Sequence, residues 1–274
     1  MSDTPLSIEE IHKGTLEILK KIIEICDEIN INYFVAYGSL IGAVRHKGFI
    51  PWDDDFDIMM LRPDYEIFCK YCEENRDKLG CFKLMSKFNT PDYPFNIPRF
   101  CDLRYRMESE GYLDAGMGMF IDIYPVDGAG NIEYKRFNPD KFKKKMYIKL
   151  SILTLNNEFI PSSKGKIHNA IKYLLFRYFQ TKGDKYFLRK WDKMSEKYSF
   201  TESKYLSVMV WDQSLYYYER EWFDDFVYLE FEGMQVKVPH KYDEVLKKIY
   251  GDYMKLPPKE QQIATHSYKL YRND

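Results

Sequence analysis

Cysteine is scarce in this chain: five residues among 274, an odd number that argues against a framework of disulfide bonds. Long apolar runs are also missing. None approaches the length of a membrane-spanning helix, and the first residues lack the apolar stretch of a signal peptide. We therefore expect a cytoplasmic protein, either free or at the inner face of the membrane. The net charge is only −1, so nothing in it indicates a nucleic-acid partner.

Apolar residues, by contrast, are plentiful. They make up 45% of the chain and charged residues 30%, so the chain can bury a substantial core and does not have the composition of a disordered protein. A length of 274 residues suits one large domain or two small ones. The composition therefore favours an enzyme-sized globular unit.

The most informative feature is an acidic cluster. Four of the five residues from Asp53 to Asp57 are aspartates, with no Lys or Arg among them. Like charges this close repel one another, and a bound divalent cation is the simplest way to offset them. Residues 56–61 have a strand pattern, so Asp55 and Asp57 are predicted to share a face, with Asp53 if the extended chain begins that early. Such a pair forms half of an oxygen cage for Mg²⁺.

A predicted phosphate-binding turn precedes this cluster. Residues 33–37 have the pattern of a short strand, Gly38 and Ser39 end it, and residues 40–46 have the pattern of a short helix. The free N–H groups at the start of a helix bind phosphate well. A phosphate-binding turn followed by an Asp-x-Asp strand indicates metal-assisted phosphoryl transfer.

The string from Tyr37 to Ile58, with its Gly-Ser turn and paired aspartates, resembles the LicD family of phosphocholine transferases, within the DNA polymerase β-like nucleotidyltransferase superfamily. Further stretches that resemble the family are Gly118–Gly128, Val238-Pro239, Tyr242–Leu246, Tyr250–Met254 and Leu256–Pro258. The resemblance spans roughly residues 10 to 270, and is weakest from about Asn131 to Lys204. It implies transfer of phosphocholine, or a similar alcohol phosphate, from a CDP-linked donor such as CDP-choline to a sugar hydroxyl. The acceptor would be a surface glycan, such as lipopolysaccharide or teichoic acid, or its lipid-linked precursor.

The resemblance also implies a third carboxylate on a neighbouring strand, and Asp122 is the matching residue. It is the only charge in the apolar run Phe120–Tyr124, where an Asp is costly unless something pairs with it. Asp55, Asp57 and Asp122 are thus predicted to be catalytic and to hold Mg²⁺ or Mn²⁺, with Asp53 as a further ligand. The alternative for Asp122 is a cap at a strand end, and Asp127, before Gly128, has the pattern of an ordinary turn.

Other candidate residues surround this set. Gly38 and Ser39 are predicted to bind phosphate through backbone N–H groups, and Arg45 and Arg99 to supply cations for a diphosphate. His266 lies in the C-terminal stretch that resembles the family. The alternative for each Arg is a surface charge and for the His a structural role.

Aromatic residues, 17% of the chain, bear on the transferred group. A quaternary ammonium has no proton to donate, so aromatic faces must hold it. Trp52 and Trp211 are weak candidates, and core or surface packing is the alternative for both.

Two other classes of function remain open. A true nucleotidyltransferase would pass a nucleoside monophosphate to a small acceptor and release pyrophosphate. A non-catalytic glycan- or nucleotide-binding protein would suit the aromatic content but would leave the costly aspartates unexplained. Zinc binding by Cys69 and Cys72 with Cys81 and Cys101 is a further alternative, although the spacing matches no structural zinc pattern.

We predict an α/β (α+β) fold with a mixed, nucleotidyltransferase-like sheet flanked by helices. Residues 1–130 would form the catalytic core, 131–203 a helical insertion, and 204–274 strands and a helix completing the same unit. The predicted elements are helices at 8–29, 63–78 and 242–250, strands at 82–86, 97–103 and around Ile121, and a hairpin about Gly233. The segment Lys141–Lys149 is basic and residues 167–180 are aromatic-rich, a pattern typical of peripheral contact with an anionic membrane; the alternative is a solvated face beside a core helix.

Overall fold

The computed structural model describes residues 4–91, 93, 95–109, 115–132, 165–183, 196–209, 216–264, 266 and 268–273, with positions 143, 146, 159, 161, 163, 186, 189, 190, 193 and 194. Its helices are α1 (Ile8–Glu28), α2 (Tyr37–His46), α3 (Arg62–Glu74), α5 (Lys166–Gln180) and α7 (Tyr242–Tyr250). Its strands are β1 (Phe34–Val35), β2 (Asp57–Leu61), β3 (Phe82–Met85), β4 (Arg99–Asp102), β5 (Tyr105–Ser109), β6 (Met119–Gly128), β7 (Tyr205–Val208), β8 (Tyr218–Glu219), β9 (Phe226–Phe231), β10 (Met234–Pro239) and β11 (Tyr268–Arg272). Single 3₁₀ turns lie at Arg76–Lys78, Arg220–Phe223 and Lys259–Gln261.

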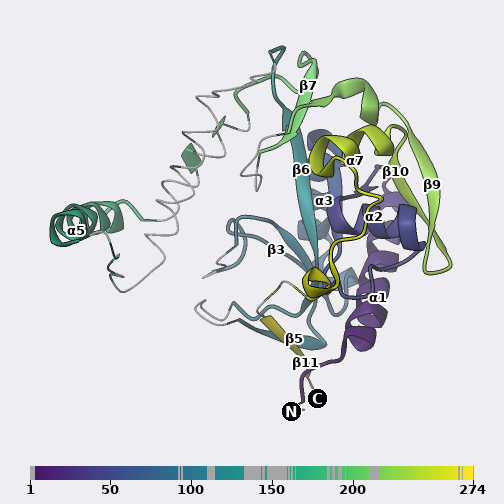
Figure 1. The fold of residues 1–274 in the computed structure, drawn as a ribbon, viewed down its shortest axis with the longest axis horizontal. Helices are drawn as coiled ribbons and strands as arrows, with labels where there is room; N and C mark the ends of the chain where they lie inside the picture. Colours follow the sequence, from purple (N-terminus) through teal and green to yellow (C-terminus); the bar gives the residue numbers. More distant parts are fainter. Residues whose placement is uncertain are drawn as a thin grey trace.

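A mixed sheet organises the molecule. Its main path runs β1-β2-β6-β4-β3, and β7 and β8 extend it from the second half of β6. Strands β2 and β6 are parallel, whereas the other pairs are antiparallel. Helices α1, α2, α3 and α7 gather around this sheet, and α5 stands apart from it (Figure 1). The predicted mixed sheet flanked by helices is confirmed.

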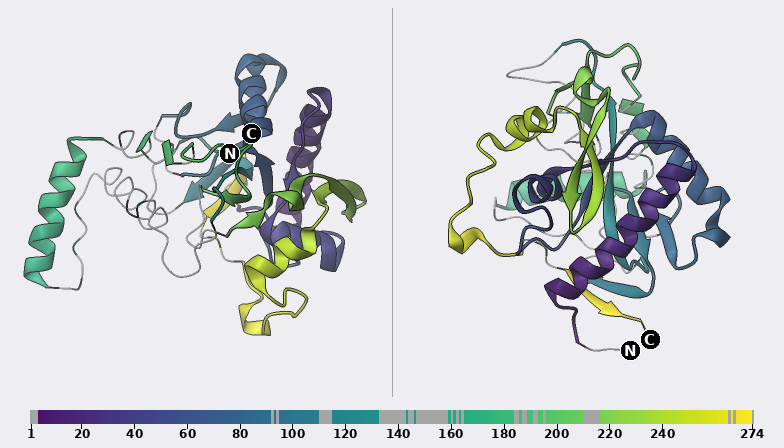
Figure 2. Two further views of the ribbon diagram at one scale, coloured as in Figure 1. Left: turned by 90° about the horizontal axis from the view of Figure 1, so that it is seen from above. Right: turned by 90° about the vertical axis from the view of Figure 1, so that its right-hand side faces the viewer.

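The first helix forms where its pattern predicts. Ser7 accepts a hydrogen bond from Glu10 N, and the Glu10 side chain accepts one from Ser7 N, a capping box that satisfies two free N–H groups. The face that α1 buries carries Ile18, Leu19, Ile22 and Ile25. Figure 2 shows α1 running along the body of the molecule as a single straight element. Its capped start and apolar stripe fix where the chain enters β1.

Two apolar clusters lie on the two faces of the parallel strand pair. Ile58 and Met60 of β2 pack, with Ile121 and Ile123 of β6, in the main core. Met59 and Tyr124 belong to a second cluster, which also includes parts of β1, β7, the Arg220–Phe223 turn and α7. Because side chains alternate along a strand, Asp57 and Asp122 project to the second face, beside Met59 and Tyr124.

The C-terminal hairpin and helix confirm a further prediction. Strands β9 and β10 pair in register from Phe231–Met234 to Phe226–Pro239, and the two turn residues, Glu232 and Gly233, both have positive φ. That is the conformation of the tight turn that matches strand twist. Phe231 packs at 4.9 Å from Phe49 and at 5.1 Å from Phe56, so the hairpin supports the chain leading into the acidic cluster.

Several predicted boundaries are wrong. The strand predicted at 33–37 is only β1, and α2 already begins at Tyr37, so Gly38 and Ser39 lie in the first helical turn rather than in a turn before it. Asp127 is not a turn residue: it lies buried within β6 and pairs with Arg62 at 2.6 Å, because the strand continues to Gly128. The pairing of β5 with β11 was not predicted.

The middle of the chain is described in part. Helix α5 falls in the predicted helical stretch. Of the predicted basic segment only Lys143 and Met146 are among the described residues, and Trp211 lies outside them. No helix among the described parts of the chain is long and apolar enough to cross a membrane.

Candidate active site

The acidic loop that leads into β2 is fastened at three points by residues from distant elements. His12 of α1 contacts the Asp53 carbonyl oxygen at 2.7 Å, and the Tyr268 hydroxyl donates to the Asp54 carbonyl at 3.0 Å. Asp57 N donates to the Ser39 hydroxyl at 2.9 Å. The His12 ring stacks on Phe49 at 3.9 Å, which fixes its orientation. The backbone of the loop is therefore held in place independently of its carboxylates.

The parallel pairing of β2 and β6 brings two predicted site residues together. Asp57 and Asp122 are register partners, and Asp122 N donates to the Phe56 carbonyl at 3.1 Å. Asp55 lies in the extended chain two residues before β2 begins. The structure thus confirms that Asp122 lies on the strand next to the Asp-x-Asp motif.

The carboxylates strongly affect one another. Burial raises the pKa of Asp57 well above its usual range, and the charges of Asp55 and Asp122 raise it further. Burial, together with the charge of Asp53, raises the pKa of Asp55 to about 8, and Asp55 shares a side-chain hydrogen bond with Asp53. Burial and repulsion between neighbouring negative groups both raise the pKa of a carboxyl in this way. The site therefore has a strong preference for added positive charge.

Two cationic side chains offset part of this charge. Arg99 Nε donates to Asp122 Oδ1 at 2.7 Å, and both side chains are more than nine-tenths buried. His266 contacts Asp54 Oδ1 through Nδ1 at 2.7 Å, and its Nε2 lies 3.4 Å from Asp55 Oδ2. The hydrogen bond to Asp54 raises the pKa of His266 to about 9. Neither Asp53 nor Asp57 forms an ion pair with a cationic side chain among the described residues.

Asp55 and Asp57 fit the requirements of a divalent cation. Asp57 Oδ1 is buried and has no hydrogen-bond partner among the described residues, an arrangement that is costly for a carboxylate oxygen and suits a metal ligand. Across the described part of the chain, no three His, Cys, Asp or Glu side chains lie close enough together to hold one ion. Asp122 is paired with Arg99 in this structure. The metal role therefore stays a prediction for all four aspartates, Asp53, Asp55, Asp57 and Asp122.

The start of α2 lies directly against the acidic loop. A Cβ placed on Gly38 would lie 2.7 Å from Asp53 Oδ2, so the absence of a side chain there lets this carboxylate approach the helix N-terminus. The first-turn N–H groups of a helix have no acceptor within it, and they favour negative charge. Gly38 and Ser39 thus lie in the first turn of α2, where phosphate binding by backbone N–H groups is predicted. The Ser39 hydroxyl accepts a hydrogen bond from Asp57 N.

Gly38→Ala should reduce activity without destabilising the fold. Alanine is the better helix former, by about 1 kcal/mol in a helix interior, but its methyl group would displace the Asp53 carboxylate and narrow the approach to the α2 N-terminus. We expect an unchanged or higher melting temperature and a fall in turnover of about tenfold or more. Thermal denaturation and initial rates measure the two effects.

A double-mutant cycle with Asp53→Ala gives the control. If the Gly38→Ala effect acts through Asp53, the two losses of rate will not add, because both remove the same interaction. Fully additive losses would contradict this explanation.

The remaining predicted residues lie as follows. Arg45 donates from Nη1 to the Tyr253 carbonyl at 3.0 Å, so in this structure it joins α2 to the segment after α7. Trp52 is partly buried against the main core. His12 and Tyr268 were missed by the sequence reasoning. Each is a single ring that contacts the acidic loop from a distant part of the chain. The one sequence signal for Tyr268 was its position two residues after His266, in the C-terminal segment that resembles the family.

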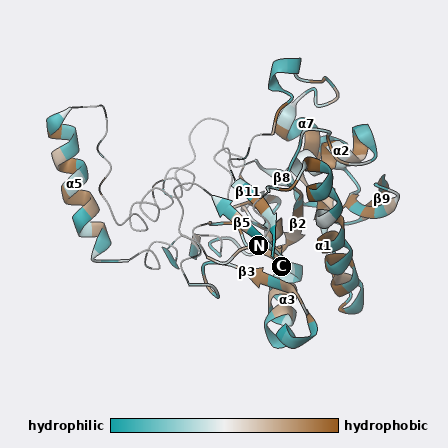
Figure 3. Ribbon diagram, turned by 90° about the horizontal axis from the view of Figure 1, so that it is seen from below, coloured by the Kyte–Doolittle hydropathy of each residue, from teal (hydrophilic) through white to brown (hydrophobic). Residues whose placement is uncertain are grey.

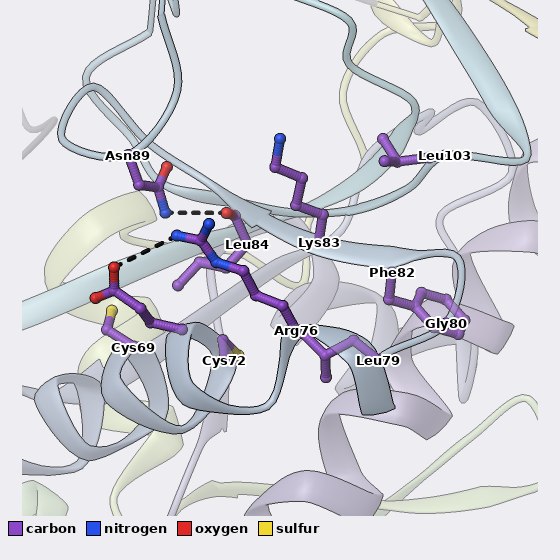
Figure 4. A pocket seen from close by; sticks show the side chains of 11 residues that line it. Cys69, Cys72, Arg76, Leu79, Gly80, Phe82, Lys83, Leu84, Asn89 and Leu103 are labelled. Atoms are coloured by element: carbon purple, nitrogen blue, oxygen red, sulfur yellow. Dashed lines mark hydrogen bonds and ion pairs between the residues drawn. The ribbon is translucent and has the colours of Figure 1, made fainter.

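A separate pocket of about 180 Å³ lies between α3 and β3 (Figure 4). It contains none of the predicted site residues and lies away from the carboxylates. Cys69 and Cys72 line it, and burial raises the pKa of Cys69 to about 11 and that of Cys72 further. Zinc binds thiolates, so these protonated thiols do not favour the zinc alternative. All five cysteines are free.

Comparison with known proteins agrees with this geometry. Residues 30–151 match the family model described as LicD/FKTN/FKRP, nucleotidyltransferase domain. The chain is 31% identical, over 97% of its length and 98% of the relative, to the lipopolysaccharide cholinephosphotransferase LicD of Haemophilus influenzae. An uncharacterised protein of Rickettsia prowazekii is 44% identical over 27% of this chain and 25% of its own. The chain therefore belongs to the LicD family, and it is a transferase.

Proposed function

We propose that this protein transfers phosphocholine, or a closely similar alcohol phosphate, from a CDP-linked donor to a sugar hydroxyl of lipopolysaccharide or another surface glycan, in a reaction that needs Mg²⁺ or Mn²⁺. The observation that carries the proposal is the hydrogen bond from Asp57 N to Ser39. Through this bond the chain of the paired aspartates adjoins the first turn of α2, so the groups that we propose to hold the metal and the phosphate are neighbours. The full-length similarity to a cholinephosphotransferase supports the choice of donor.

Each residue has a role in this reaction. Asp55 and Asp57 would hold the metal ion, which would supply charge to the diphosphate oxygens. The N–H groups of Gly38 and Ser39 would hold a phosphate oxygen at the start of α2. The acceptor hydroxyl attacks the phosphorus that carries the alcohol, the bond to the bridging oxygen breaks, and CMP leaves with that oxygen. Asp122, kept in position by Arg99, would receive the hydroxyl proton or join the metal ligands.

The products of the reaction test the proposal. With CDP-choline, Mg²⁺ and a deacylated lipopolysaccharide acceptor, we expect CMP to appear in step with phosphocholine on the glycan, and EDTA to stop both. Pyrophosphate released from a nucleoside triphosphate, without CMP from any CDP-alcohol, would instead indicate a nucleotidyltransferase. Binding of CDP-choline without any turnover would indicate a binding protein.

Helix α5 suits contact with a membrane, where a lipid-linked acceptor would lie. Five of its exposed apolar side chains follow one stripe, and Tyr173 is exposed outside it; the five are Ile167, Ile171, Leu174, Leu175 and Tyr178. The helix contains Lys166, Lys172 and Arg177 and no acidic residue. Figure 3 shows apolar and polar residues on different sides of α5, which stands apart from the body. An apolar stripe flanked by cations is typical of helices that lie in an anionic lipid surface. We therefore propose that α5 contacts the inner face of the cytoplasmic membrane.

Removing the apolar stripe should abolish this contact. We expect wild type to float with vesicles of phosphatidylcholine and phosphatidylglycerol, and the variant Ile171→Asp/Leu174→Asp to stay behind. Neutralising Lys166 and Arg177 should cost about 1 kcal/mol each on anionic vesicles only. Ile67→Asp, which changes an exposed apolar residue of α3, is the control and should float normally. The membrane role would be contradicted if wild type does not bind vesicles but self-associates, and the double variant abolishes that self-association.

A further inference from the structure

One aromatic site beside the carboxylates already holds a cation of the protein itself. The Arg99 guanidinium lies 3.9 Å from the ring centre of Phe95 and 3.8 Å from that of Phe120, while Nε bonds to Asp122. Two ring faces and one carboxylate stabilise this guanidinium, and its Nη1 is buried with no hydrogen-bond partner among the described residues. This aromatic pair is therefore occupied, and the positive group of a substrate must be held elsewhere.

Tyrosines line the other side of the carboxylates. Tyr124 follows Asp122 by two residues on β6, so the two side chains share a face of the sheet. The ring of Tyr37 meets that of Tyr124 edge-on, with centres 4.9 Å apart. Both rings belong to the second apolar cluster. An aromatic surface thus begins directly beside Asp57 and Asp122.

The backbone of Tyr37 is strained. Its φ is +47°, in the left-handed region, which costs a residue with a Cβ roughly 1–2 kcal/mol. A glycine at position 37 would not have this strain, because it has no Cβ. Strain of this kind persists at functional sites, where the side chain is needed in one position. The Tyr37 ring is the group that this backbone conformation places against Tyr124.

The end of helix α7 packs on the same cluster. The Tyr216 hydroxyl donates to the Ile249 carbonyl at 3.4 Å, and Tyr216 and Ile249 pack on the cluster that contains Tyr37 and Tyr124. Tyr250, the next residue, ends α7 with 43% of its surface exposed. Desolvation raises the pKa of the Tyr250 hydroxyl, and the charges of Asp57, Asp53 and Asp55 raise it further, so this hydroxyl lies within electrostatic reach of the acidic loop.

We propose that Tyr37, Tyr124 and Tyr250 form the binding site for the quaternary ammonium of the transferred phosphoalcohol. The site combines the two things that such a cation needs, since aromatic rings lie beside the aspartate carboxylates of β2 and β6. The proposal rests on the function proposed above and names its substrate class: an alcohol phosphate with a methylated ammonium rather than a primary one. Trp52 is not needed for it.

Substitutions at Tyr250 test the site, because this residue is half exposed and its loss does not open the core. Tyr250→Leu should raise KM for CDP-choline about tenfold and leave KM for CDP-ethanolamine within twofold, because a primary ammonium still finds hydrogen-bond acceptors among the carboxylates. Tyr250→Phe keeps the aromatic face and should behave as wild type. Tyr228→Leu removes an exposed tyrosine of β9 and serves as the matched control.

Calorimetry separates this inference from the proposed function. Phosphocholine alone, titrated with Mg²⁺ present, should bind wild type and Tyr250→Phe, and bind Tyr250→Leu about tenfold more weakly. Equal losses for choline and ethanolamine compounds, or no loss for either, would overturn the tyrosine site even if CMP is released. If wild type releases CMP from no CDP-alcohol, the proposed function fails, and the phosphocholine titration still decides the tyrosine site.

Discussion

Asp57→Asn should lose about a thousandfold in the rate of CMP release and yet melt at a higher temperature than wild type. Its carboxylate is buried, its pKa lies far above the usual range because of burial and of Asp55, and Oδ1 has no hydrogen-bond partner among the described residues. Asparagine keeps the shape and cannot ionise beside Asp55 and Asp122, so the cost of ionising or protonating a buried carboxylate disappears. A gain of roughly 1–3 kcal/mol, about 3–8 °C for a chain of this size, follows in buffer with EDTA.

The matched control is Asp127→Asn. Asp127 is likewise buried, on the neighbouring strand β6, but it is paired with Arg62 at 2.6 Å. Removing one partner of a buried pair leaves an uncompensated charge and costs about 3–5 kcal/mol. The two substitutions, identical in chemistry, should therefore shift the melting temperature in opposite directions. A loss of stability in Asp57→Asn comparable to that in Asp127→Asn would show that Asp57 is a structural residue.

The contrast between these two aspartates also shows what the sequence could and could not reveal. Asp57 and Asp122 each stand at the start or in the middle of an apolar run, where a charge needs a partner, so local pattern singled them out. The resemblance to the LicD family was needed to place Asp122 on the strand beside Asp57. Asp127 precedes a glycine, and local pattern indicated a turn. The strand instead continues through Gly128, because β7 pairs with it and Arg62 satisfies the charge.

What escaped prediction depends on contacts between residues far apart in the chain. His12 reaches the Asp53 carbonyl across 41 positions, and Tyr268 reaches Asp54 across 214. Strands β5 and β11 pair across a similar span, and each is too short to stand out by its own alternation. The early start of α2 has a local cause that the pattern concealed, since Tyr37 adopts a positive φ that only glycine or asparagine would have indicated.

Without a divalent cation, the contribution of Asp55 and His266 to stability should fall as the pH rises from about 4 to above 9. Asp55 has a pKa of about 8 in the folded protein against 3.8 for the free group, and His266 about 9 against 6.5. Both folded values are raised, so the folded state binds more protons than the unfolded state. The stabilisation is complete below the unfolded values and is lost as the pH passes the folded ones.

Mg²⁺ should reverse this trend by replacing the proton. The gain in melting temperature on adding Mg²⁺ should be small near pH 6, where Asp55 is protonated, and larger near pH 9, on the order of 2 kcal/mol or roughly 4–8 °C. Asp55→Asn should flatten the pH profile in EDTA and remove most of the Mg²⁺ effect, whereas Asp127→Asn should leave the Mg²⁺ effect intact. Scanning fluorimetry over this pH range gives both profiles. A melting temperature in EDTA that rises with pH, or an Mg²⁺ effect that survives in Asp55→Asn, would mean that the cation is not held by the acidic loop.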